Sequence, residues 1–263
     1  MSGADREAVQ ACAGRLDAAR REVREVTMVT ADNPWIDVER AYDVQEALRD
    51  LQQARGLRIT GMKMGLTSYP KMKQMGVETP IYGFLTDELA VDDGGSVAAA
   101  ALIHPKVEAE IAFVTARELR GPGCDEAAVL AATAFVLPAI ELIDSRYRDF
   151  KFDLPSVIAD NTSAAHYAVG SRPVPVAGLD LETLGVVLEK NGQVMEVGAG
   201  AAVLGNPARA VAMLVNMLGA RGQALPAGSL VLAGAVTAAI PVAAGDSVLV
   251  RADGLGTVGF RLR

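Results

Sequence analysis

Helical periodicity dominates the first 55 residues of the chain. Apolar residues separated by three or four positions form two sets: Val9, Cys12, Leu16, Ala19 and Val23, then Ile36, Val38, Ala41, Val44, Leu48 and Leu51. This spacing places each set on one face of an amphipathic helix. We therefore predict two helices and treat residues 1–56 as an N-terminal helical segment.

Strand-length apolar runs replace the helical pattern after residue 56. Residues 58–65 and 106–114 read as strands, and Asn191-Gly192 predicts a tight hairpin turn within residues 185–197. Asn206-Pro207 is a typical helix start, and Gly222 ends that helix. Further strands are expected over residues 230–233, 247–250 and 257–262. Residues 57–263 thus read as one β-rich α+β domain with flanking helices.

The segment that follows Asp125 is expected to change from helix to strand near a proline. Asp125 is a good N-cap for a helix that runs to Val136. Pro138 then opens an apolar segment, and residues 139–143 are predicted to form a buried strand.

Charge and composition exclude several classes of function. With 25 basic and 32 acidic residues the net charge is −7, which offers no basic surface for nucleic acid or anionic lipid. The acidic start, without an apolar run, does not fit a secretory signal. Residues 224–245 carry no charge, but prolines and glycines interrupt them, so a membrane span is not expected. Two cysteines, Cys12 and Cys124, fit a reducing cytoplasm.

Three glutamates stand out in the predicted strands. Glu108 and Glu110 alternate with apolar residues and therefore project from the same strand face. Glu141 lies between Ile140 and Leu142, where a buried, unpaired carboxylate would be costly. Such a trio suggests a site for Mg²⁺ or Mn²⁺. The alternative is two solvent-exposed glutamates and a Glu141 held in a salt bridge.

Lys63 is a second candidate, because it lies between Met62 and Met64 with a glycine on either side of them. This setting can hold an amine beside an anion, although a lysine that extends from a strand to solvent fits as well. The sequence shows no nucleophile elbow, phosphate-binding loop or dinucleotide fingerprint.

At these residues the sequence resembles the fumarylacetoacetate-hydrolase superfamily, within it the decarboxylase and hydratase branch of the meta-cleavage pathway for aromatic compounds. The similar stretches cover residues 63–68, 71–83, 104–113, 139–154, 158–165 and 198–207. The resemblance implies a mixed β-sheet roll or barrel with flanking helices. Hydrolase members usually keep a lysine after the third metal ligand, where this chain has Asp160-Asn161. Hydrolytic carbon–carbon cleavage is therefore not expected.

The resemblance also implies a site and an activity. It makes Glu108, Glu110 and Glu141 the ligands of Mg²⁺ or Mn²⁺ and Lys63 the catalytic residue, with a substrate-binding wall drawn from Asp144, Arg146, Asn161, Ser163 and Thr237. The implied reaction is metal-dependent loss of CO2 from the 2-oxo dicarboxylate 2-oxo-3-hexenedioate. Hydration of 2-hydroxypentadienoate, or a non-catalytic role as partner subunit of that hydratase, stays open. Homo-oligomers or a complex with the hydratase are the expected assemblies.

Overall fold

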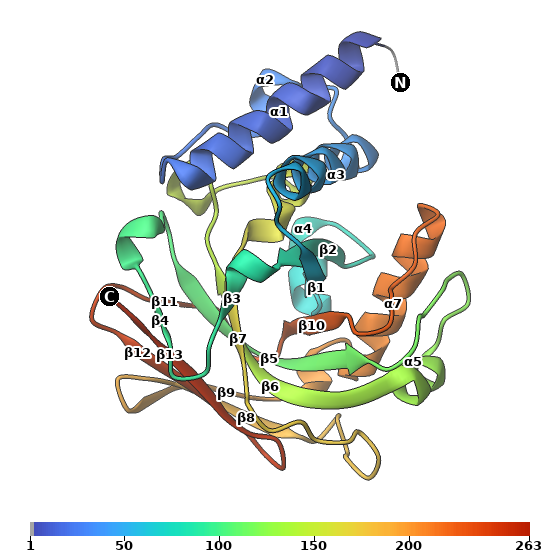
Figure 1. Cartoon of the computed structure of the whole chain (residues 1–263), viewed down its shortest axis with the longest axis vertical. Helices are drawn as coiled ribbons and strands as arrows, with labels where there is room; N and C mark the ends of the chain where they lie inside the picture. Colours follow the sequence, from blue (N-terminus) through green and yellow to red (C-terminus); the bar gives the residue numbers. More distant parts are fainter. Residues whose placement is uncertain (1–2) are drawn as a thin grey trace.

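The computed structural model describes residues 3–263, which form two curled β-sheets with helices packed around them (Figure 1). The larger sheet has eight strands in the order β2-β1-β10-β5-β6-β7-β3, with β11 paired to β5. The smaller sheet has five strands in the order β4-β13-β12-β8-β9. Both parallel and antiparallel pairs occur in each sheet. The predicted α+β fold with a mixed β-sheet roll is confirmed.

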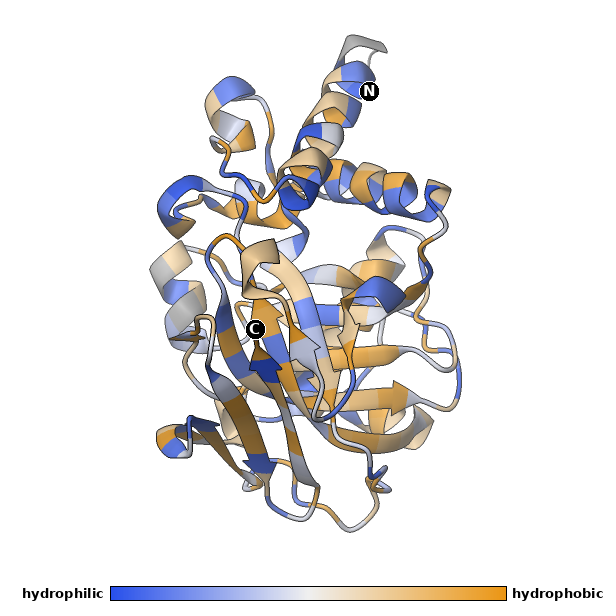
Figure 2. Cartoon of the chain, turned by 60° about the vertical axis from the view of Figure 1, so that its left-hand side comes forward, coloured by the Kyte–Doolittle hydropathy of each residue, from blue (hydrophilic) through white to orange (hydrophobic). Residues whose placement is uncertain are grey.

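The N-terminal helices lie together at one end of the molecule (Figure 1). They are α1 (Gly3–Arg21), the short α2 (Val29–Asp32) and α3 (Val38–Ala54), so both predicted helices are confirmed. Asp37 caps α3 by accepting a hydrogen bond from the Arg40 amide. Blue and orange residues alternate along α1 and α3 in Figure 2, as expected for helices with one buried face. The apolar core runs from these helices into the sheets.

Central strands of the larger sheet are buried along most of their length. Its members are β1 (Ile59–Gly65), β2 (Ile81–Thr86), β3 (Ala90–Val91), β5 (Lys106–Thr115), β6 (Thr133–Ile143), β7 (Ala164–Val169), β10 (Leu230–Ala235) and β11 (Ile240–Pro241). The uncharged residues 224–245 contain β10 and β11 and not one continuous helix.

The smaller sheet contains the predicted hairpin. Its strands are β4 (Ser96–Val97), β8 (Gly185–Lys190), β9 (Gln193–Ala199), β12 (Ser247–Ala252) and β13 (Gly256–Leu262). Asn191 and Gly192 connect β8 to β9 with φ angles of 55° and 77°, the positive values that a tight hairpin turn requires. The hairpin prediction is confirmed, and β9 forms an edge of this sheet.

Shorter helices connect the strands. They are α4 (Tyr69–Met75), α5 (Glu126–Ala132), α6 (Leu154–Ala159) and α7 (Pro207–Ala220), together with the 3₁₀ turns η1 (Asp87–Leu89), η2 (Ala99–Ala101), η3 (Arg148–Phe150), η4 (Asn161–Ser163) and η5 (Gly200–Ala202). One stretch in the described chain, Gly200–Ala220, is long and apolar enough to cross a membrane, but 56% of its most apolar 18-residue window is buried within the protein. We interpret it as a core segment, since α7 buries most of its apolar residues.

The predicted boundary between helix and strand after Asp125 is wrong. Asp125 does cap α5, but the helix ends at Ala132 and β6 begins at Thr133, so Pro138 lies inside the strand. Thr133, Phe135 and Val136 favour extended backbone. Pairing with β5, from Thr115 to Lys106, reinforces this preference and extends the strand back to Thr133.

Candidate active site

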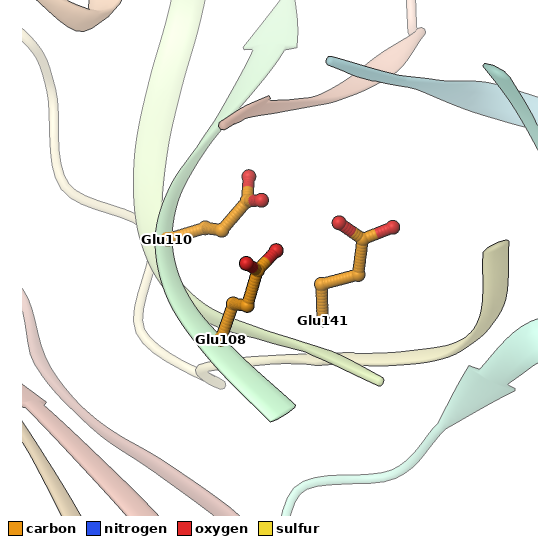
Figure 3. Close-up of side chains that lie close together, drawn as sticks. All are labelled: Glu108, Glu110 and Glu141. Atoms are coloured by element: carbon orange, nitrogen blue, oxygen red, sulfur yellow. The ribbon is translucent and has the colours of Figure 1, made fainter. Parts of the chain in front are cut away.

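The three glutamates converge on one point inside the larger sheet (Figure 3). Glu108 and Glu110 project from the same face of β5, and Glu141 of β6 is the register partner of Glu108. Each residue offers a carboxylate oxygen that lies within 4.8 Å of those of the other two. The alternative of two solvent-exposed glutamates is wrong, because Glu108 and Glu110 are only 8% and 0% exposed.

Burial makes this cluster electrostatically costly without a cation. Burial raises the pKa of Glu110 well above the usual value. The nearby Glu141 and Glu108 raise this pKa further, whereas Lys63 lowers it. Burial and Glu108 also raise the pKa of Glu141, and Lys63 opposes that shift. Glu110 Oε2 accepts a hydrogen bond from the Gly234 amide at 2.7 Å. Glu110 Oε1 is buried with no hydrogen-bond partner among the described residues.

A divalent cation fits this arrangement. Carboxylate oxygens are the donors that Mg²⁺ and Mn²⁺ prefer, and a cation would compensate for the repulsion among the three glutamates. Glu110 Oε1 accepts no hydrogen bond from the described residues, so this oxygen is available to a cation. The donor set therefore matches the predicted metal, while the assignment of the individual ligands stays a prediction.

Lys63 lies beside the glutamates. Its side chain is 3% exposed, which rules out a lysine that extends to solvent. Nζ is 3.1 Å from Glu141 Oε1 and donates a hydrogen bond to the carbonyl oxygen of Thr162 at 3.0 Å. Glu141 therefore does form the salt bridge that the alternative interpretation predicted. It nevertheless lies next to Glu108 and Glu110, so the three glutamates still form one cluster.

A cavity of about 220 Å³ opens next to Lys63 and Glu108. Its apolar wall includes Ile81, Ile143, Phe150, Phe152 and Val157, and its polar groups come from Thr67, Lys106, Thr162 and Ser163. The volume suits a small organic acid better than a nucleotide. The lining thus combines two cations and a carboxylate with aromatic and aliphatic side chains, and Lys106 lies over the Phe150 ring.

A left-handed turn forms the wall beside Lys63. Asn161, Thr162 and Ser163 have φ angles of 49°, 53° and 57°, values that cost energy for residues other than glycine. The turn is held by its neighbours: Asn161 accepts from the Phe84 amide and donates to the Phe84 carbonyl, and Thr162 Oγ1 donates to the Tyr82 carbonyl. A Cβ atom on Gly83 would lie 2.7 Å from the Asn161 carbonyl oxygen.

The predicted substrate wall is only partly assembled at this cavity. Ser163 lines it, and its buried Oγ has no hydrogen-bond partner among the described residues. Thr237 lies close by, where its hydroxyl accepts from the amide of Ala109, between two of the glutamates. Asn161 fastens the turn to β2, and Asp144 accepts from the amides of Ile103 and His104.

Arg146 lies behind the turn instead of in the cavity. Its guanidinium pairs with Asp160 and donates to the carbonyl oxygens of Asp144 and Ala164. It lines a second cavity, of about 510 Å³, together with Arg20, Arg55, Asp144 and His166. The structure does not bring Arg146 or Asp144 to the glutamates, and the substrate-binding role of all five wall residues stays a prediction.

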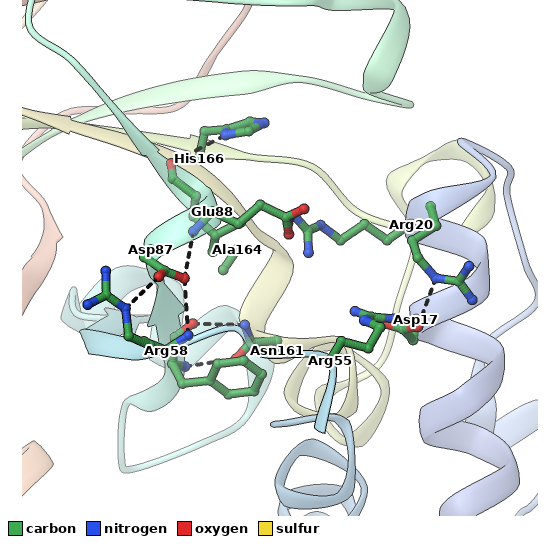
Figure 4. A network of polar contacts seen from close by, with 12 residues as sticks. Asp17, Arg20, Arg55, Arg58, Asp87, Glu88, Asn161, Ala164 and His166 are labelled. Atoms are coloured by element: carbon green, nitrogen blue, oxygen red, sulfur yellow. Dashed lines mark hydrogen bonds and ion pairs between the residues drawn. The ribbon is translucent and has the colours of Figure 1, made fainter. Parts of the chain in front are cut away.

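A polar network next to this second cavity joins α1 to the larger sheet (Figure 4). The buried Asp17 of α1 pairs with Arg55 and Arg21, and Arg20 pairs with Glu88 at 3.0 Å. His166 points its Nδ1 toward the Leu89 carbonyl oxygen at 3.3 Å. These contacts attach the N-terminal helices to the strands that carry the site.

Lys106, Phe150 and Thr162 are site residues that we did not single out from the sequence. Lys106 shares the two-residue period of Glu108 and Glu110, so the strand pattern contains the signal. The positions of Phe150 and Thr162 depend on left-handed backbone at residues that do not favour it, which no local pattern predicts.

Comparison with known proteins agrees with this architecture. The model of the fumarylacetoacetate (FAA) hydrolase C-terminal family matches residues 60–263. A 4-oxalocrotonate decarboxylase from a Pseudomonas species is 56% identical over 256 residues, 97% of each chain. A 2-hydroxyhexa-2,4-dienoate hydratase from Comamonas testosteroni is 39% identical over 98% of each chain. The structure of a Pseudomonas putida 4-oxalocrotonate decarboxylase complexed with magnesium and adipate matches with a TM-score of 0.96 at 53% identity, over 98% of each chain.

Proposed function

The chain belongs to the fumarylacetoacetate hydrolase family, and on that premise we propose that it is a metal-dependent 4-oxalocrotonate decarboxylase. It converts 2-oxo-3-hexenedioate to 2-hydroxypenta-2,4-dienoate and CO2 in the meta-cleavage pathway. The observation that carries the proposal is the buried glutamate trio beside Lys63 at a cavity of about 220 Å³. Identity favours decarboxylation over hydration, since the decarboxylase relative is 56% identical and the hydratase relative 39%.

Glu108, Glu110 and Glu141 are the residues that hold Mg²⁺ or Mn²⁺ in this proposal. When bound, the ion supplies a Lewis acid that polarises the 2-oxo group and favours negative charge on its oxygen. The Gly234 amide, which donates to Glu110 Oε2, fixes the orientation of that carboxylate.

The reaction breaks the C5–C6 bond of the substrate. The C6 carboxylate leaves as CO2, and its bonding electrons form a C4–C5 double bond while the former C3–C4 double bond moves to C2–C3. Negative charge then rests on the 2-oxo oxygen, which takes up one proton. No covalent nucleophile is needed in this scheme, because the 2-oxo group of the substrate itself accepts the electron pair.

Lys63 is the residue that acts on the developing charge. Its Nζ is fixed by Glu141 and by the Thr162 carbonyl oxygen, so the ammonium stays at one point of the cavity wall. From there it stabilises the enolate oxygen electrostatically and can pass a proton to it. Ile81, Phe152 and Val157 add apolar surface to the same cavity.

The chain also presents a surface suited to assembly. Val194 and Val197 on the edge strand β9 are 62% and 66% exposed. An edge strand with exposed apolar residues favours pairing with another chain. We assign this surface to a homo-oligomer, and a complex with the hydratase that consumes the product is the other expected assembly. A cytoplasmic location stays a prediction.

Two substrates separate this function from its nearest rival. The purified protein, loaded with Mg²⁺, is given 2-oxo-3-hexenedioate in one assay and 2-hydroxypenta-2,4-dienoate in another. We expect the first to be consumed with release of CO2 and the second to remain unhydrated. Water addition to the second without loss of CO2 from the first would identify a hydratase. Inactivity toward both would favour a non-catalytic subunit.

A further inference from the structure

Lys106 is a cation of the cavity to which the mechanism above gives no role. It is the first residue of β5 and projects from the same strand face as Glu108 and Glu110. Its side chain lines the cavity, and Nζ lies 4.0 Å from the centroid of the Phe150 ring. Within the described chain no carboxylate forms an ion pair with it.

We propose that Lys106 binds the distal carboxylate of the substrate and thereby selects a six-carbon 2-oxo dicarboxylate over acids with one carboxylate. The proposal rests on the proposed function, because it takes the first carboxylate and the 2-oxo group to lie at the glutamate trio. It makes Lys106 a specificity-determining residue of the same site.

The length of the strand repeat fits such a substrate. Alternate residues of a strand are separated by about 6.6 Å, so the side chains of Lys106 and Glu108 leave β5 about that far apart. An extended six-carbon chain, with bonds of about 1.5 Å, places its terminal carbons roughly 6 Å apart. A dicarboxylate of that length can thus reach from the glutamates to Lys106 along the same strand face.

Charge balance points in the same direction. Three carboxylates are matched by a divalent cation and the ammonium of Lys63. A dianionic substrate therefore adds two negative charges to a largely buried site, and among the described lining residues Lys106 is the cation besides Lys63 that can offset one of them. Opposite charges attract more strongly where burial lowers the effective dielectric constant.

Phe150 holds this cation at the cavity. Asp149 and Phe150 both have φ angles of 57°, and this left-handed backbone directs the ring toward Lys106 and Phe152, whose ring centroid is 5.7 Å away. A lysine ammonium over an aromatic face is attracted to it and partly desolvated. Lys106 therefore meets the distal carboxylate in apolar surroundings rather than in bulk water.

The kinetic signature follows from the fate of that carboxylate. The distal group is the one lost as CO2, so its charge, and with it the ion pair, weakens as the reaction proceeds. An interaction that is strongest in the ground state lowers KM without raising kcat. Lys106→Met should therefore raise KM about 10- to 100-fold and leave kcat unchanged or slightly higher.

Ligand binding tests the proposal independently of turnover. Calorimetry on the Mn²⁺-loaded protein would compare adipate, which has two carboxylates, with hexanoate, which has the same chain length and one carboxylate. We expect the wild type to bind adipate about 10- to 100-fold more tightly than hexanoate. Lys106→Met should remove this preference and leave binding of oxalate, a short metal chelator, unchanged. Lys106→Arg should retain most of the preference.

Lys151→Met is the matched control, because Lys151 lies between the two phenylalanines but its side chain is 80% exposed. The control should bind adipate like the wild type. An undiminished adipate preference in Lys106→Met, or equal loss of adipate and oxalate binding, would overturn the proposal. So would a wild type that binds hexanoate as tightly as adipate. Failure of the proposed function would instead appear as a wild type that binds adipate but releases no CO2 from 2-oxo-3-hexenedioate.

Discussion

At the scale of single residues, the free-energy cost of burying three glutamates together indicates what the site binds. Burying several like charges together is unfavourable, and here three carboxylates share one buried site next to the single ammonium of Lys63. Such a cluster is retained where a function needs it, and a divalent cation supplies both the function and the missing charge.

Replacing one glutamate should therefore separate metal binding from folding. Glu110→Gln keeps the shape of the side chain and an oxygen that can accept from the Gly234 amide, but removes one negative charge. We expect Mn²⁺ affinity to fall on the order of 100-fold, with no loss of thermal stability in the metal-free protein. Titration calorimetry and thermal unfolding measure both.

Glu118→Gln provides the comparison, since Glu118 is on the surface with 47% of its side chain exposed. It should bind Mn²⁺ like the wild type. If Glu110→Gln bound the metal equally well, Glu110 would not be a ligand.

Lys63 should affect turnover more than metal binding. Lys63→Met removes the ammonium that lies 3.1 Å from Glu141 and faces the cavity. We expect kcat to fall about 100- to 1,000-fold, the usual effect of losing one electrostatic contact to a developing oxyanion. Mn²⁺ affinity, measured on the same protein, should fall much less. A parallel loss of both quantities would assign Lys63 a structural role.

At the scale of elements, the left-handed turn Asn161–Ser163 positions backbone and side-chain groups at the cavity. It carries the carbonyl oxygen that accepts from Lys63 and the hydroxyl of Ser163, and it is strained at all three residues. The hydrogen bonds to β2, and the absence of a side chain at Gly83, allow it to form. The sequence shows that residue 83 is a glycine, but it does not show that the Asn161–Ser163 turn packs against it.

Filling that space should displace the turn. Gly83 is the register partner of Lys63, and a Cβ atom there would come within 2.7 Å of the Asn161 carbonyl oxygen. We expect Gly83→Ala to lower the free energy of unfolding by about 1–3 kcal/mol and to reduce turnover more than Mn²⁺ affinity. Urea unfolding and steady-state kinetics provide these values.

Gly185→Ala is the matched substitution in a strand, because a Cβ atom at Gly185 meets no atom within 4 Å. It should change stability by no more than about 0.5 kcal/mol. Equal stability and activity of the two variants would show that the turn does not depend on Gly83.

We expect His166 on β7 to make the free energy of unfolding depend on pH. Burial lowers its pKa below the usual 6.5, and the nearby Arg20 lowers it further, so the folded protein binds this proton less readily than the unfolded chain does. The stability that the neutral side chain provides is complete above pH 6.5 and is lost as the pH falls toward the lowered pKa.

Urea unfolding at pH 7.5 and pH 5.5 tests this contribution. His166→Asn should reduce the loss of unfolding free energy between the two pH values, by at most about 1.4 kcal/mol for each unit of pKa shift. An unchanged loss in the variant would show that His166 does not contribute.

The elements also show where local patterns are sufficient. Helical periodicity predicted α1 and α3, the Asn-Gly pair predicted the β8–β9 turn, and alternation predicted the shared face of Glu108 and Glu110. The helix after Asp125 was predicted too long because pairing between β5 and β6 is a long-range contact. The family resemblance implied Arg146 and Asp144 as substrate-wall residues, but they line the second cavity, where the backbone and Asp160 engage their polar atoms.

At the scale of the whole molecule, our proposal is that the edge strand β9 pairs with a second copy of the chain. We expect Val197→Lys to reduce the mass of the particle in solution, because a charge on an exposed edge opposes strand pairing. Gln193→Lys, at an exposed polar position of the same strand, should leave the mass unchanged. Light scattering on both variants measures this. A wild type that is already monomeric, or a Val197→Lys variant of undiminished mass, would contradict the assignment of β9.

In the proposed function, the assembled site removes a carboxylate in a metal-dependent reaction. The most direct measurement is carbon-13 spectroscopy of 2-oxo-3-hexenedioate labelled at C6 and incubated with the protein, with Mg²⁺ or with a chelator. The account predicts that the label appears as CO2 and bicarbonate with Mg²⁺, that the unlabelled product is 2-hydroxypenta-2,4-dienoate, and that the chelator stops the reaction. A label that remains in an organic carboxylate in the presence of Mg²⁺ would contradict it.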